Sequence, residues 1–73
     1  MTRKNYNSIA TAFGLDMRLL SNIEGNALVG AWQMVDAFCL VATADNPRFD
    51  SERFGNWVRE TFQGLRDSEG KKV

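Results

Sequence analysis

The sequence contains no histidine, only one cysteine and only one proline among its 73 residues. A single cysteine cannot form a disulfide within the chain, and without histidine or a second cysteine a structural zinc site has no ligands. Cys39 also lacks a histidine that could activate it as a nucleophile. We therefore expect a protein that is not an enzyme and that needs no metal or other cofactor.

An excess of charge is also lacking, because nine basic residues balance nine acidic ones. No broad positive field of the kind that attracts nucleic acid is present, so nucleic acid is disfavoured as a partner. The first residues, Met1 to Lys4, are not followed by the apolar segment of a secretory signal. The longest nearly apolar run, residues 37–42, is too short to span a bilayer. We expect a soluble cytoplasmic protein without a membrane partner.

Apolar side chains at helical spacing are abundant, since hydrophobic residues make up 44% of the chain. Three segments repeat them at i, i+3, i+4 and i+7, and none shows the alternation of a strand. The pattern predicts an all-α bundle of three helices, or four if residues 16–21 form a short connecting turn. Residues 1–66 would form one domain and residues 67–73 a flexible polar tail. A core this small gains stability from self-association, so a homodimer is one expectation.

The first helix is predicted to begin after Thr2, a suitable N-cap. Its apolar face contains Tyr6, Ile9, Ala10 and Phe13. Gly14 is placed as the residue that follows a helix and adopts a positive φ. We therefore expect this helix to end near Gly14.

The second helix is predicted to start near Ser21, because Ser21 and Glu24 have the spacing of a capping box. Its main apolar stripe consists of Leu28, Ala31, Trp32, Val35, Phe38, Cys39 and Ala42. Four further apolar residues lie off this stripe, namely Val29, Met34, Leu40 and Val41. A helix that is apolar on more than one side is either central in its fold or covered by another chain. These four residues form our candidate partner or dimer surface.

The third helix has the clearest local signals. Pro47 should end the preceding helix near Ala44, and Asp50 is a good N-cap for the next one. Phe49 and Phe54 have the spacing of a hydrophobic staple. The apolar face of this helix is predicted to contain Phe54, Trp57, Val58, Thr61, Phe62 and Leu65.

Two arginines at this junction form a second candidate site. Arg48 and Arg53 flank Phe49 in the sequence and could bind an anion or an acidic partner. The alternative is that they pair with neighbouring carboxylates at the surface, for about 0–1 kcal/mol each.

Two sets of residues form a recognisable pattern: Thr2-Arg3-Lys4 with Tyr6 and Ile9-Ala10, and Asn46-Pro47-Arg48-Phe49-Asp50 with Arg53-Phe54. The pattern resembles a group of short helical proteins encoded by phages and prophages. Members of that group continue with small residues and Cys-Gly, whereas this chain has Gly-Asn-Trp-Val at 55–58. The resemblance implies a phage protein without catalytic residues in a bacterial host. It favours a protein-interaction module that binds itself or a host factor, and counter-defence inhibition is one version.

A competing pattern covers residues 9–24, which resemble a repressor-type helix-turn-helix. A small residue, a turn glycine and an apolar residue stand at the expected places, Ala10, Gly14 and Leu20. In this alternative the protein is a DNA-binding regulator, and three residues face the major groove, namely Met17, Arg18 and Asn22. The simpler interpretation is that one helix ends at Gly14 and another begins at Ser21.

Overall fold

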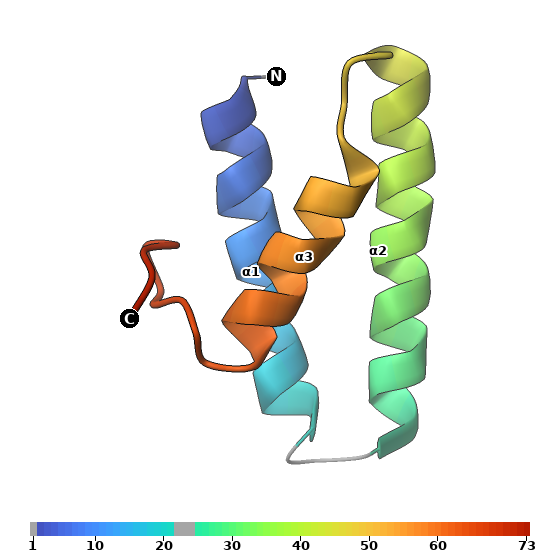
Figure 1. The fold of residues 1–73 in the computed structure, drawn as a ribbon. Coiled ribbons are helices and arrows are strands. Elements are labelled where there is room, and N and C mark those ends of the chain that lie inside the picture. Colours follow the sequence, from blue (N-terminus) through green and yellow to red (C-terminus); the bar gives the residue numbers. More distant parts are fainter. Residues whose placement is uncertain (1, 22–24) are drawn as a thin grey trace.

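The computed structural model describes residues 2–21 and 25–73 of the chain. They form three helices, α1 (Arg3–Ser21), α2 (Gly25–Asp45) and α3 (Ser51–Phe62). Helices α1 and α2 lie side by side, and α3 crosses obliquely over them and packs mainly against α1 (Figure 1). Within the described ranges the only β-pairing is one isolated bridge between Arg66 and Lys72. The predicted small all-α bundle is confirmed.

The start of α1 confirms Thr2 as its N-cap. The Thr2 Oγ1 accepts a hydrogen bond from the Asn5 backbone N–H at 3.3 Å, and the Asn5 Oδ1 accepts one from the Thr2 N–H at 3.1 Å. This reciprocal pair is a capping box in which asparagine replaces the usual glutamate. Two backbone donors that the helix itself cannot satisfy are thereby bonded.

The prediction that α1 ends near Gly14 is wrong, because the helix continues to Ser21. Gly14 is buried, and a Cβ atom built on it would lie 2.5 Å from Thr61 Cβ and 2.8 Å from the Val58 backbone oxygen. Glycine is needed here for the close approach of α3 and not for a turn. Residues 16–21 are therefore the last part of α1 and do not form a fourth helix.

Helix α2 ends at Asp45, one residue beyond the predicted end at Ala44. The turn that follows is fixed by Asn46, whose Oδ1 accepts a hydrogen bond from the Arg48 N–H at 3.1 Å. This is the local side-chain bonding that asparagine favours in turns. The predicted start of this helix near Ser21 is wrong, because Ser21 is the last residue of α1 and α2 begins at Gly25. The other member of the predicted capping box, Glu24, lies outside the described residues.

Helix α3 begins as the sequence predicts. The Asp50 Oδ1 accepts a hydrogen bond from the Arg53 N–H at 3.0 Å, and the rings of Phe49 and Phe54 lie 5.5 Å apart as a staple. The helix ends earlier than expected, at Phe62. Leu65 follows the helix and is 53% exposed, so its predicted place on the apolar face is wrong.

The core consists of side chains from all three helices, namely Tyr6, Ala10, Met17, Val35, Ala42, Phe54 and Val58. Aromatic rings account for much of it. Phe38 stacks on Phe54 with 5.1 Å between the ring centroids, and Tyr6 lies 4.7 Å from Phe49. These rings join the start of α1 to the junction between α2 and α3.

Residues 67–73, expected to be a flexible polar tail, instead fold back against α1 and α3 (Figure 1). The Val73 N–H donates to the Leu65 carbonyl at 3.0 Å, and the Arg66 Nη1 donates to the Gly70 carbonyl at 2.8 Å. Gly70 is buried and has a φ of 82°. A Cβ atom at this position would lie 2.9 Å from the Trp57 ring. The segment packs because a glycine at this point allows the chain to turn onto the tryptophan.

Candidate functional site

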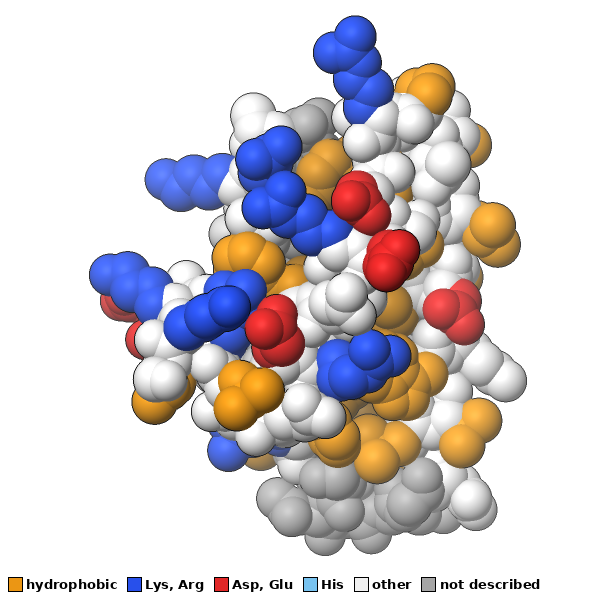
Figure 2. Space-filling model, viewed as in Figure 1, with side chains coloured by type: hydrophobic (Ala, Val, Ile, Leu, Met, Phe, Trp, Pro, Cys, Tyr) orange, Lys and Arg blue, Asp and Glu red, His pale blue; other side chains and the backbone are white. Residues whose placement is uncertain are grey.

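The outer face of α2 carries large apolar side chains that nothing in the structure covers. Val29, Met34, Leu40 and Val41 are 61%, 65%, 74% and 69% exposed. Hydrophobic side chains are visible along the α2 edge of the molecule in Figure 2. The structure therefore places the four residues predicted as a partner surface on the open side of one helix. We call them, with the small residues between them, the α2 face.

Three small residues lie between the large ones on the α2 face. Gly30, Ala37 and Ala44 are all exposed and are spaced about two helical turns apart. A Cβ atom built at Gly30 meets no other atom within 4 Å. Small residues at this spacing let a second helix approach the backbone closely.

Helix α2 is long and apolar enough to cross a membrane by length and composition. The window Asn26–Asp45 has a mean hydropathy of 1.5, and 17% of it is buried. The run 37–42 is too short to span a bilayer by itself, and the whole helix reaches the required length because less apolar residues on both sides of that run are included. A single apolar helix of this length is also found as a core helix in soluble proteins. The helix contains two acidic residues, Asp36 and Asp45, and no basic residue.

Arg48 and Arg53, predicted as an anion or partner corner, line one pocket of about 340 Å³. The structure adds Arg3, which reaches the same pocket from the first turn of α1. The other lining residues are Tyr6, Asn7, Asn46, Phe49, Asp50 and Phe54. We call this site the arginine pocket. Sequence reasoning missed Arg3 as a site residue, although it belongs to the first of the two segments in the phage-like pattern.

Arg48 and Arg53 do not form the ion pairs with neighbouring carboxylates that the alternative interpretation predicted. The ion pairs among the described residues are Arg66–Glu60 at 3.3 Å and Lys71–Glu69 at 3.6 Å. The arginine pocket thus contains three guanidinium groups without an ion pair in the described part of the chain. Its one carboxylate, that of Asp50, already caps α3.

The helix-turn-helix predicted for residues 9–24 is wrong for the part that the structure describes. Residues 9–21 belong to one unbroken helix, because Gly14 makes a helix contact and not a turn. Met17, a predicted DNA contact, is 1% exposed and belongs to the core. Arg18 is exposed in the last turn of α1. Asn22 lies outside the described residues.

Cys39 is a free, half-buried thiol. Burial is the largest influence and raises its pKa above the ordinary value; a hydrogen bond with Ser51 partly offsets this rise, and the nearby charge of Asp36 adds a smaller rise. A raised pKa keeps the thiol protonated, and a protonated thiol is a poor nucleophile. The geometry around Cys39 thus favours a packing role.

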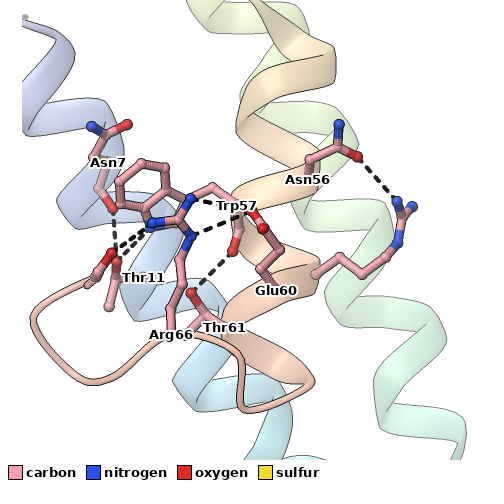
Figure 3. A network of polar contacts seen from close by, with 9 residues as sticks. Asn7, Thr11, Asn56, Trp57, Glu60, Thr61 and Arg66 are labelled. Carbon is pink, nitrogen blue, oxygen red and sulfur yellow. Dashed lines mark hydrogen bonds and ion pairs between the residues drawn. The ribbon is translucent and has the colours of Figure 1, made fainter. Parts of the chain in front are cut away.

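A network of polar contacts joins α1, α3 and the C-terminal segment (Figure 3). The Trp57 Nε1 donates to the Thr11 Oγ1 at 2.9 Å, and the Arg66 guanidinium lies 3.6 Å above the Trp57 ring. Arg66 also pairs with Glu60. Because these polar groups bond to one another, the network holds the fold together and is not a candidate catalytic centre.

Comparison with known proteins found no family model that matches the chain and no significant match among curated proteins or solved structures. The function must therefore be argued from the α2 face and the arginine pocket.

Proposed function

We propose that this protein is a non-catalytic protein-interaction module whose docking surface is the α2 face. The observation that carries this proposal is the exposure of four large apolar side chains on one helix, at 61–74% each. Several large apolar side chains exposed on one side of a helix typically mark a site where another molecule binds. The resemblance to phage-encoded proteins supports a cytoplasmic role in a bacterial host, where the module, paired through its α2 face, binds and modulates a host factor.

The occupant of the α2 face, in this proposal, is a second copy of the chain. The molecule is flat, with extents of 35 × 27 × 15 Å. Its accessible surface of 5132 Å² exceeds by about 600 Å² the surface expected of a compact monomer of 8.2 kDa. Two copies that each covered this excess would bury roughly 1,200 Å² in total, which is the lower limit of specific interfaces.

The shape of the α2 face also fits a copy of itself. If two α2 helices pack antiparallel and cross at Ala37, Gly30 of one copy faces Ala44 of the other. Small residues on both sides let the helix axes approach to about 8 Å, with the large side chains Val29, Met34, Leu40 and Val41 packing around them. Because α2 carries no basic residue, apolar burial and not ion pairing drives this association.

A membrane is a poorer occupant than a second copy. Asp36 stands at the middle of the window Asn26–Asp45, and an aspartate at the centre of a membrane-spanning helix costs about 2.5–3.5 kcal/mol. At a helix dimer interface the same side chain can remain at the solvent-exposed margin.

The test replaces Leu40, the most exposed of the four large residues on the α2 face. Leu40→Glu should convert a dimer into a monomer when the molar mass is measured by light scattering after size exclusion. Placing two buried glutamates at one interface is strongly unfavourable, whereas an exposed substitution changes the stability of a monomer by about 0.5 kcal/mol or less.

The matched control is Leu65→Glu, which introduces the same charge at an exposed leucine outside α2. This variant should remain dimeric. A wild-type protein that is a monomer at all concentrations contradicts the second copy as occupant. A wild-type protein that sediments with lipid vesicles, or that becomes dimeric only with a host protein bound, contradicts it as well.

A further inference from the structure

Three arginines from three separate parts of the chain meet at the arginine pocket. Arg3 comes from the first turn of α1, Arg48 from the junction after α2, and Arg53 from the first turn of α3. Figure 2 shows Lys and Arg side chains over much of this face, several of them in its upper half beside acidic side chains. The pocket and the α2 face share no residue, so this site is independent of the proposed docking surface.

The positive charge of the pocket is not balanced among the residues that line it. Three guanidinium groups and the carboxylate of Asp50 leave two net positive charges among the lining residues. A phosphate monoester carries about −1.5 to −2 charges at pH 7, whereas a single carboxylate carries one. Charge complementarity therefore favours phosphate. Arginine is also the side chain best suited to phosphate, because its planar fork donates two parallel hydrogen bonds.

The rest of the pocket lining is aromatic and amide. Phe49 is half-buried and lines the pocket. The centroid of its ring lies 4.7 Å from that of Tyr6 and 5.5 Å from that of Phe54. A planar ring on the ligand can pack against Phe49 in an offset-stacked or edge-to-face geometry. Asn7 and Asn46 supply amide groups at the same pocket. The site thus pairs a cationic rim with a small aromatic floor.

The junction that carries Arg48 and Phe49 is held in place before any ligand binds. Asn46 bonds to the Arg48 N–H, Asp50 caps α3, and Pro47 has a restricted backbone. A preformed site loses less conformational entropy on binding. We propose that the arginine pocket binds a phosphate monoester that also carries a planar ring, with the three arginines on the phosphate and Phe49 against the ring.

The experiment titrates the ¹⁵N-labelled full-length protein with phenyl phosphate, AMP, O-phosphotyrosine and inorganic phosphate in a phosphate-free buffer of low ionic strength. The proposal expects saturable shifts at the pocket residues with at least one of the three ring-bearing ligands. It also expects that ligand to bind about fivefold or more tightly than inorganic phosphate. The tighter of AMP and O-phosphotyrosine identifies a nucleotide or an aryl phosphate as the source.

Two variants on α3 make the result specific. Arg53→Gln should weaken binding about tenfold, because one charge-assisted hydrogen-bond donor to the phosphate is lost. Arg59→Gln, on the same helix but outside the pocket, should leave the affinity unchanged. If Arg53→Gln fails to give a folded protein by circular dichroism, Arg3→Gln takes its place with the same expected loss.

Three results would overturn the proposal. The first is no saturable binding of any ring-bearing ligand up to about 10 mM. The second is equal effects of Arg53→Gln and Arg59→Gln, which would indicate non-specific attraction to the charge of the whole protein. The third is binding of inorganic phosphate as tight as that of the tightest ring-bearing ligand, which would show that Phe49 contributes nothing.

Discussion

Gly14 lies where α1 and α3 approach most closely, and its missing side chain makes that approach possible. Its neighbour across the contact, Thr61, is fully buried, and the Thr61 Oγ1 donates to the Trp57 carbonyl at 3.0 Å. The threonine is therefore fixed by its own helix and cannot move away from an added methyl group. A close-packed contact of this kind resists any increase in volume.

Overpacking a core usually costs about 1–3 kcal/mol, and alanine gains about 1 kcal/mol over glycine in a helix. We therefore predict that Gly14→Ala lowers the free energy of unfolding by a net amount of up to about 2 kcal/mol. Gly55→Ala is the control, because a Cβ atom at Gly55 of α3 meets nothing within 4 Å; it should stabilise. Urea denaturation measures both. Equal stabilisation by the two substitutions would show that α1 and α3 are not in tight contact at Gly14.

Sequence patterns alone could not have predicted that Gly14 lies at a helix contact or that Arg3 lines the arginine pocket. A glycine at a helix end and a glycine at a helix crossing occur in similar local sequences, and only the position of Thr61 distinguishes them. Arg3 is remote from Arg48 and Arg53 in the chain, and the packing of α1 on α3 brings it to the arginine pocket. By contrast, Asp50 as the cap of α3 was predictable, because capping depends on neighbouring residues only.

The C-terminal segment is an element that local propensity did not predict, since its order depends on contacts with Trp57 and Arg66. Within the segment, Asp67 organises the turn, and its Oδ1 accepts hydrogen bonds from the Glu69 N–H at 2.9 Å and the Lys71 N–H at 3.0 Å. The hydrogen bond from Lys71, followed by that from Glu69, lowers the pKa of the Asp67 carboxyl group. These donors favour the ionised form of the carboxylate.

We predict that the packing of residues 67–73 is stable above the ordinary carboxyl pKa of about 3.9 and weakens as the pH falls through the lowered pKa of Asp67. The sign follows because the folded state holds the proton less tightly than the unfolded state. The NMR signal of the Trp57 indole N–H, which bonds to Thr11 beside this segment, should shift in that acidic range. Asp67→Asn should remove this step, and an unchanged acid transition in the variant would assign the titration to another group.

At the element scale, the apolar pattern of α2 predicted which residues face the core but not what covers its second apolar side. Its stripe of core residues and its end near Pro47 were predictable, and the exposure of Met34 and Leu40 agrees with the excess of apolar residues in the sequence. The pattern could not establish whether α3 covers the second apolar side. The structure shows that α3 packs mainly on α1 and leaves the α2 face open.

At the scale of the whole molecule, the flat shape separates two surfaces with different chemistry. The α2 face is apolar and contains Gly30, Ala37 and Ala44, whereas the arginine pocket is cationic and lies at the junction of the three helices. Because the two surfaces share no residue, pairing through α2 would leave a pocket on each copy free to bind. The proposed dimer would therefore present two identical anion sites.

The central claim is that two copies meet through the α2 face. The most direct measurement is an isotope-filtered NOE experiment on a mixture of ¹³C-labelled and unlabelled protein, which detects contacts between different copies only. The account predicts intermolecular NOEs from the methyl groups of Val29, Met34, Leu40 and Val41. The absence of such NOEs at millimolar concentration, or intermolecular NOEs that arise only from other surfaces, would contradict it.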